Sequence, residues 1–437
     1  MATYVVNTKE QQQAMLKEIN KTVDDLLAPI PDNVRFKGEL NLPNGVSEFE
    51  ALDIMKGYAN QNIVFKTVLR GAGAYVHYIP SVVKHLSARE EFVTAYTPYQ
   101  SELSQGILQS IFEYQSIMAD LTGMDAANAS VYDGATAAAE AITMCIEKKQ
   151  KKVLLAKTLH PETIQTILTY NQYLDHEVII VDEKDGRVDM DDLKAHLSDD
   201  VACFVYQHPN YYGILEDAKG ISELVKTTKA KVVASVNPTS LALLASPKDN
   251  GVDIAVGEAQ PFGLSIALGG PYLGFMATTE KLVRKLPGRI VGQTEDKEGK
   301  RAFALTLQAR EQHIRREKAL SSICSNQAHC ALVAGMYVSA MGPVGLQEVA
   351  QASVNNAHYL QKELEKIGFT LTYDQPFFHE FVTETPKNSK EVEDFLASKN
   401  ILAGYPLNDH QMLWCATEVL NKEKIDEVIS YLKEGIA

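Results

Sequence analysis

The 437-residue sequence has no long apolar run, no paired cysteine motif and no excess of positive charge. No segment approaches the roughly 20 consecutive apolar residues of a membrane-spanning helix, so we expect no membrane association. The opening residues, MATYVVNTKEQQQAML, lack the basic and then apolar order of a signal peptide. Together these absences predict a cytoplasmic protein.

Few cysteines and an acidic charge balance exclude further classes of function. The five cysteines are scattered and none forms a CxxC pair, so neither a disulfide framework nor a metal site is indicated. The net charge of −14 argues against a nucleic-acid surface, which needs a basic face. With 45% hydrophobic and 22% charged residues, the composition is typical of a soluble globular protein.

The length and the order of the patterns predict three parts. Residues 1–70 are expected to form an N-terminal helical arm that begins with an amphipathic helix over residues 8–27. Residues 71–341 are expected to form a large α/β domain, and residues 342–437 a compact α+β domain.

In the large domain, short β-branched runs alternate with helical patterns. Several runs are almost wholly apolar, as in a sheet covered on both faces. The expected strands are residues 153–156, 177–181, 201–205, 231–236, 253–256 and 273–277. Ligands bind at the carboxyl ends of such strands, so we expect the loops that contain His160, Gln207, Asn237 and Glu258 to line a site.

A polar and aromatic run precedes a helical pattern near residue 100. Tyr96, Tyr99, Gln100 and Glu102 surround a proline and offer little to an apolar core, so they belong either to the surface or to a site. The helix that follows is expected to end at Gly123, where a left-handed cap would stop it. Its expected apolar stripe comprises Leu103, Ile107, Ile111, Met118 and Leu121.

The turn of Asp133, Gly134 and Thr136 leads into an alanine-rich run with high helix propensity. A small, glycine-containing turn before a helix exposes backbone N–H groups at the positive end of the helix dipole, where a phosphate would bind. The same residues could simply cap an ordinary helix. The local sequence leaves both interpretations open.

A glycine-rich turn at residues 71–80 carries Tyr75 and His77. Glycines beside aromatic side chains let a backbone approach a ligand closely, which favours a site. The alternative is that His77 is a surface or core histidine whose ring binds a backbone group.

Seven stretches of the sequence resemble, in order, the P-protein of the glycine cleavage system, the pyridoxal-phosphate-dependent glycine decarboxylase. They are GAGAYVHYIP (71–80), YTPYQSELSQG (96–106), TGMDAANAS (122–130), YDGATAAAEA (132–141), GGPYLGFMA (269–277), PGRIVG (287–292) and REQHIRREKALSSICSNQA (310–328). The resemblance is to the N-terminal half of that protein, or to the separate alpha subunit found where the enzyme is split in two. It implies a fold-type-I pyridoxal-phosphate-transferase-like large domain with a smaller C-terminal α+β domain.

Enzymes of that fold need a lysine to hold the cofactor as a Schiff base, an aspartate beside the pyridine nitrogen, and a phosphate cup. No lysine lies between Lys248 and Lys281, the interval in which the resemblance places it. The strand at residues 231–236 ends in valine and is followed by Asn237, so the aspartate is missing as well. Only the cup-like turn at residues 133–136 remains, as a vestige.

The resemblance therefore implies an alpha subunit that is not active alone. A homologous beta subunit would carry the lysine and the covalently bound pyridoxal phosphate, in an alpha2beta2 assembly. Glycine would lose carbon dioxide there, and the aminomethyl group would pass to the lipoyl arm of the H-protein. The residues implied to complete the glycine and cofactor pocket from this chain are Tyr75, His77, Tyr96, Tyr99, Gln100 and Glu102.

Two other classes of function remain open at this point. One is a self-sufficient pyridoxal-phosphate enzyme of the aminotransferase type, with its lysine elsewhere in the chain. The other is a non-catalytic scaffold that stabilises the beta subunit or docks the H-protein. Cofactor uptake by the isolated chain tests the first, and alanine substitutions in residues 96–100 test the second.

Overall fold

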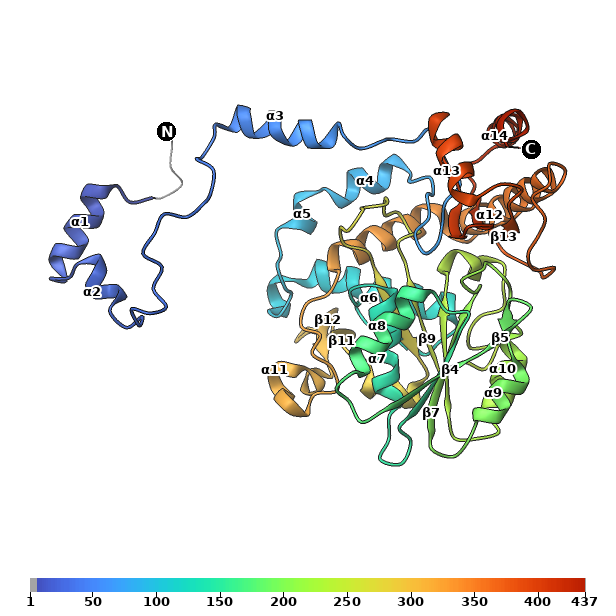
Figure 1. Cartoon of the computed structure of the whole chain (residues 1–437). Coiled ribbons are helices and arrows are strands. Elements are labelled where there is room, and N and C mark those ends of the chain that lie inside the picture. Colours follow the sequence, from blue (N-terminus) through green and yellow to red (C-terminus); the bar gives the residue numbers. More distant parts are fainter. Residues whose placement is uncertain (1–5, 437) are drawn as a thin grey trace. The chain divides into compact units, whose positions relative to one another are not determined.

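The structure is a computed structural model that describes residues 6–436, and it divides into two compact units, Met1–Val64 and Phe65–Ala437 (Figure 1). The helices of the first unit are α1 (Lys9–Glu18), α2 (Val23–Leu27) and α3 (Glu48–Ala59). Each of them begins with a capping box, in which the cap side chain and the third helical residue satisfy each other's backbone N–H groups.

The prediction of a single helix over residues 8–27 is wrong, because the chain forms two helices there, α1 and α2. Asn20 has a left-handed φ of 50°, which α-helical backbone does not allow. Thr22 then accepts a hydrogen bond from the N–H of Asp25 and starts the second helix. The sequence TxxD at residues 22–25 is the signal for this interruption.

The second unit is built on a seven-stranded sheet. Its strands are β2 (Ala126–Ala127), β3 (Lys152–Ala156), β4 (Glu177–Val181), β7 (Val201–His208), β8 (Lys231–Val236), β9 (Ile254–Glu258) and β10 (Gly274–Thr278). They lie in the order β2-β10-β9-β8-β7-β3-β4, with β10 antiparallel to both neighbours and the five strands from β9 to β4 parallel. All six predicted strands are present, which confirms the α/β class of this region.

Helices cover this sheet (Figure 1). The helices of the region are α4 (Ser81–Ser87), α5 (Glu90–Val93), α6 (Gln105–Thr122), α7 (Gly134–Cys145), α8 (Pro161–Asn171), α9 (Met190–His196), α10 (Ala218–Val225) and α11 (Gln312–Arg315). Helix α7 packs against β7 to β10, while α9 and α10 pack against β4 and β8. Strands β3 and β7 are buried over almost their whole length, as expected for a sheet covered on both faces.

Two short hairpins extend the second unit, β5 (Glu183–Lys184) with β6 (Arg187–Val188) and β11 (Ile290–Glu295) with β12 (Arg301–Thr306). Helix α6 ends at Gly123 in the left-handed conformation, as predicted. Its expected stripe is wrong at Leu103, which is 79% exposed because it lies in the 3-10 turn Ser101–Leu103 ahead of the helix.

The C-terminal part has a core of its own around Trp414. Its elements are α12 (Ala328–Glu365), β13 (Glu380–Glu384), α13 (Ser389–Ser398), β14 (Ile401–Leu402), β15 (Tyr405–Asn408), β16 (Gln411–Cys415) and α14 (Lys422–Gly435). Strands β13, β16 and β15 form an antiparallel sheet, and β14 pairs with β1 (Thr67–Val68). Residues 67–68 thus pair within the second unit, while the boundaries at 70/71 and 341/342 stay predictions.

Helix α12 is long and apolar enough to cross a membrane, by length and composition alone. It is interrupted at Gly342, whose φ of 61° and ψ of 179° are not helical, and Pro343 follows. Tyr337, before the break, lies in the core of the large sheet, and Leu360, after it, lies in the C-terminal core. The apolar residues of α12 therefore connect two cores.

Candidate functional site

A cavity of about 500 Å³ opens at the carboxyl ends of β3, β7, β8 and β9. Four loops after these strands contribute residues to its lining, and the N-terminal turns of α7 and α8 contribute more. The sequence predicts His160, Gln207, Asn237 and Glu258 in these loops, and all four line the cavity, although Gln207 and Glu258 lie in the last residues of β7 and β9. These segments therefore meet at one edge of the sheet, and their role in a ligand site stays a prediction.

A carboxylate occupies the anion-binding position at the start of α7. Asp133 caps the helix by accepting a hydrogen bond from the N–H of Thr136 at 2.7 Å. The N–H of Gly134 donates to Oε2 of Glu258 at 3.1 Å. Both interpretations of this turn are thus partly realised, because the helix has an ordinary cap and an anion that belongs to the chain itself.

Glu258 is held by two further backbone donors. The N–H groups of Gln260 and Leu273 donate to its Oε1 at 3.0 and 2.7 Å. Burial raises the pKa of Glu258 to about 7, although these three hydrogen bonds act in the opposite direction. A Cβ at position 134 would lie 2.9 Å from the backbone nitrogen of Glu258, so this close approach requires glycine.

Pyridoxal phosphate does not fit this cavity of the chain. No lysine is among the described residues that line it, and the N–H of Gly134 is already taken by Glu258. Asn237, after β8, accepts a hydrogen bond from the N–H of Thr239 and contacts Nε2 of His379 at 3.1 Å. An amide in that position supplies no negative charge for a pyridinium nitrogen.

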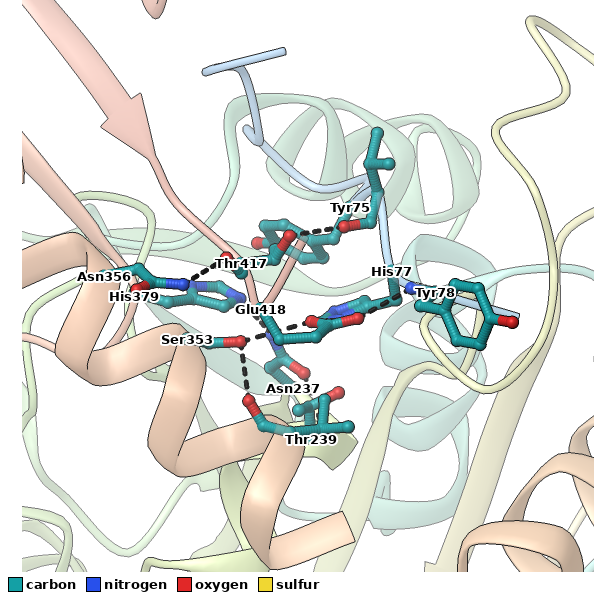
Figure 2. A network of polar contacts seen from close by, with 12 residues as sticks. Tyr75, His77, Tyr78, Asn237, Thr239, Ser353, Asn356, His379, Thr417 and Glu418 are labelled. Carbon is teal, nitrogen blue, oxygen red and sulfur yellow. Dashed lines mark hydrogen bonds and ion pairs between the residues drawn. The ribbon is translucent and has the colours of Figure 1, made fainter. Parts of the chain in front are cut away.

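Tyr75 lies in a buried network that joins residues 71–80 to the C-terminal part (Figure 2). Its N–H donates to Oε1 of Gln260 at 2.9 Å and its hydroxyl donates to Oε2 of Glu380 at 2.7 Å. Burial raises the pKa of Glu380 to about 7. The Tyr75 ring also contacts His379, with 4.6 Å between ring centroids, and burial lowers the pKa of that histidine to about 3.

His77 is part of the same network, and its side chain is only 2% exposed. Its Nδ1 lies 2.7 Å from Oε2 of Glu418, whose Oε1 accepts the N–H of Tyr78 at 2.7 Å (Figure 2). Burial alone would raise the pKa of Glu418, but the bonds from His77 and Tyr78 hold it below its usual value. Thr417 adds a hydrogen bond from its hydroxyl to the carbonyl of Val76 at 2.5 Å.

The structure does not bring all the predicted site residues together, and His77 and Thr136 line neither of two cavities. Tyr75, Asp133 and Gly134 line the cavity at the sheet edge, whereas Tyr96 lines a second cavity of about 450 Å³ beside α6 and the start of α12. Tyr96 is 94% exposed, and Tyr99, Gln100 and Glu102 are exposed as well. The 96–102 loop is on the surface, so its role in a site stays a prediction.

Arg289 and Asn326 are polar residues of the second cavity that the sequence reasoning missed. Nη2 of Arg289 donates to the hydroxyl of Tyr99 at 3.3 Å, and its guanidinium lies 5.4 Å from the centre of that ring. Nη1 donates to Oδ1 of Asn326 at 3.2 Å. The sequence feature that could have indicated this site is the position of Arg289 directly before the apolar residues Ile290 and Val291.

The fold is that of the fold-type-I pyridoxal-phosphate-dependent enzymes. An aspartate aminotransferase from Thermus thermophilus matches with a TM-score of 0.60 at 15% identity, over 84% of this chain and 98% of that one. A glutamate decarboxylase from Lactobacillus brevis matches with a TM-score of 0.67 at 14% identity, over 95% of this chain and 98% of that one.

More specific matches identify the family. The family model for the glycine cleavage system P-protein matches residues 2–432. A relative from Bacillus cereus, named "Probable glycine dehydrogenase (decarboxylating) subunit 1", is 45% identical over 98% of both chains. The crystal structure of a glycine decarboxylase (P-protein) of the glycine cleavage system, in inhibitor-bound form, has a TM-score of 0.92 and 38% identity over 100% of both chains. The chain belongs to the glycine cleavage system P-protein family.

Proposed function

We propose that this chain is the cofactor-free alpha subunit, subunit 1, of a two-chain glycine dehydrogenase (decarboxylating). The observation that carries the proposal is the cavity at the sheet edge, where Glu258 fills the anion position and no lysine is present among the described lining residues. A P-protein chain with this cavity needs a partner to supply the reactive group. The similarity to relatives named subunit 1 supports that division of roles.

The partner would be a beta subunit that carries the lysine and the covalently held pyridoxal phosphate, in an alpha2beta2 assembly. When bound there, the cofactor withdraws electrons from the α-carbon of glycine as carbon dioxide leaves. The lipoyl arm of the H-protein would then take the aminomethyl group. We place the whole assembly in the cytoplasm, without membrane or nucleic acid.

This chain would complete the glycine pocket with its exposed polar loop. In the 96–102 loop, Tyr96 and Tyr99 are large exposed rings that can exclude water from an adjoining site, and Gln100 and Glu102 add polar groups. Tyr75 and His77 would act from the buried network, by fixing the position of residues 71–80. The vestigial cup of Asp133, Gly134 and Thr136 would act only in folding.

Reconstitution tests the proposal. Glycine–bicarbonate exchange is measured for this chain alone, for the beta subunit alone, and for both chains together with lipoylated H-protein. We expect activity only in the complete mixture. Activity of this chain alone with pyridoxal phosphate would support the aminotransferase-type alternative, and activity of beta with H-protein alone would support a scaffold role.

A further inference from the structure

Arg289 is a buried cation without an anionic partner. Only 7% of its surface is exposed, and among the described residues no carboxylate lies within ion-pair distance of its guanidinium. Burying a charge without compensation costs several kcal/mol, so such a group calls for an explanation in function or in a missing ligand. The neutral contacts to Tyr99 and Asn326 do not supply the missing charge.

The backbone holds Arg289 in place from both sides. Its carbonyl accepts the N–H of Ala129 at 2.9 Å. The next residue but one, Val291, exchanges two hydrogen bonds with the side chain of Gln115, at 2.9 and 3.0 Å. Asn326 is anchored through its neighbour Gln327, whose N–H donates to Oγ of Ser130 at 3.1 Å. The two side chains are therefore preorganised.

Two neighbouring donors in this cluster have no acceptor. Nε of Arg289 and Nδ2 of Asn326 are both buried and unpartnered within residues 6–436. Both residues line the second cavity, which is about 450 Å³ in volume. A guanidinium with a free Nε–H and a free amide N–H of a residue in contact with it can bind an oxyanion with two oxygens, such as a carboxylate.

The charge of the cavity favours a monoanion. Arg289 is the one arginine or lysine among the described residues that line it, whereas a phosphate dianion is usually met by more positive charge. Two lining residues of this cavity, Val93 and Tyr96, are large apolar side chains that are 55% and 94% exposed. An apolar rim around a buried donor cluster suits a site that closes against a second chain.

We propose that Arg289, oriented by Tyr99 and Asn326, binds the carboxylate of the amino-acid substrate at the interface with the partner subunit. This inference rests on the proposed function and deepens it. Glycine has no side chain, so its carboxylate is the group by which a fixed arginine can select and orient it. Tyr99 then serves as a positioning residue, because its hydroxyl accepts from Nη2 and its ring lies under the guanidinium.

The test uses the complete complex with the partner subunit and H-protein. Arg289→Gln, which removes the charge, should raise the KM for glycine by roughly ten- to a hundredfold with a smaller change in kcat. Arg289→Lys keeps the charge but lacks the planar donor pair. Its KM for glycine should therefore lie between the KM of the wild-type complex and that of Arg289→Gln. Arg301→Gln, a change at an exposed arginine of β12, is the matched control and should leave KM unchanged.

A pair of inhibitors separates the substrate's carboxylate from other anions. Aminooxyacetate carries a carboxylate, and O-methylhydroxylamine offers the same oxyamine without one. Arg289→Gln should weaken only aminooxyacetate. An equal loss for both compounds, or weaker retention of pyridoxal phosphate, would assign Arg289 to the cofactor's phosphate, and loss of the complex on a sizing column would assign it to a partner carboxylate. Each of those results overturns the inference.

Thermal unfolding of this chain gives an independent measurement. Because Arg289 has no internal counter-ion, Arg289→Gln should leave the Tm unchanged or raise it, whereas a structural arginine would lower it. If the wild-type complex is active and the Arg289→Gln variant has the same KM for glycine, this inference is wrong and the proposed function is not affected. A wild-type complex without exchange activity contradicts the proposed function as well.

Discussion

The two cavities of the second unit differ in how their polar groups are satisfied. At the sheet edge, Glu258 accepts hydrogen bonds from the backbone N–H groups of Gly134, Gln260 and Leu273, so these donors are paired within the chain. In the cavity beside α6, no carboxylate among residues 6–436 pairs with the buried Arg289, and Nδ2 of Asn326 has no acceptor there either. Glu258 of the first cavity is thus paired within the chain, whereas the second cavity leaves two donors for an anion from outside.

The difference between the cavities lies in whether their polar groups are paired within the chain. An internal carboxylate that pairs the N–H groups of Gly134, Gln260 and Leu273 stabilises the fold without a bound anion. An unsatisfied cluster has the opposite effect on stability, and it persists where a ligand compensates for it. The comparison predicts that changes at the first cavity alter stability and that changes at the second alter activity.

The largest effect is expected for Glu258→Ala. This change leaves the N–H groups of Gly134, Gln260 and Leu273 without their acceptor in a buried site, which should cost about 3–5 kcal/mol of unfolding free energy. Urea denaturation of the isolated chain measures it. Glu258→Gln keeps one acceptor and should lose less, whereas a fully stable Glu258→Ala variant would show that the carboxylate does not support the cup.

The next effect is a dependence of stability on pH that comes from Glu380. Its folded-state pKa, about 7, lies above the unfolded value of 4.5, so the native state binds the proton more tightly. This contribution is fully present below pH 4.5 and is lost as the pH rises towards 7, with a slope of up to about 1.4 kcal/mol per pH unit. Glu380→Gln should flatten the curve of unfolding free energy in this window. An unchanged slope would mean that Glu380 is ionised in the native state.

Tyr99→Phe probes the second cavity. Removing the hydroxyl that accepts from Nη2 of Arg289 should lower kcat/KM for glycine in the complex by about tenfold. Assembly, bound cofactor and the Tm of the chain should not change. Tyr173→Phe, at a tyrosine that is 90% exposed, is the control. Full activity of Tyr99→Phe, or dissociation of its complex, would make the 96–102 loop structural.

The smallest effect is expected for Asp133→Ala. The loss of its cap on the N–H of Thr136 should cost about 1 kcal/mol of stability and leave exchange activity intact. Exchange kinetics and urea denaturation on the same preparation measure both. A large loss of activity with normal stability would show that the turn still contributes to a working site.

The strands of the large sheet could be predicted because their β-branched runs are buried on both faces, which leaves a continuous apolar pattern. The strands of the C-terminal sheet are harder to predict from the sequence. The alternating sequence FTLTY at residues 369–373 predicts a strand, yet among the described residues only Leu371 forms a bridge, to Thr383. Strand β15 was missed because it contains Pro406 and a register shift between Pro406 and Asn408, both of which break the alternating pattern.

Features of the candidate site that depend on the type of a residue could be predicted from the sequence. Features that depend on contacts between distant residues could not. The missing lysine and the glycine turn at residue 134 can be read directly from the sequence. The pairing of Tyr75 with Glu380 joins residues that are 305 positions apart, so no local pattern indicates it. The isolation of Arg289 is likewise a property of its surroundings, because sequence spacing does not show which carboxylates lie nearby.

We propose that the partner subunit, and not this chain, holds the pyridoxal phosphate of the complex. Borohydride reduction of the active complex, followed by peptide mass mapping of both chains, tests it most directly. We predict a pyridoxyl group on a single lysine of the partner subunit and none on this chain. A pyridoxyl-lysine at one defined position of this chain would contradict the account.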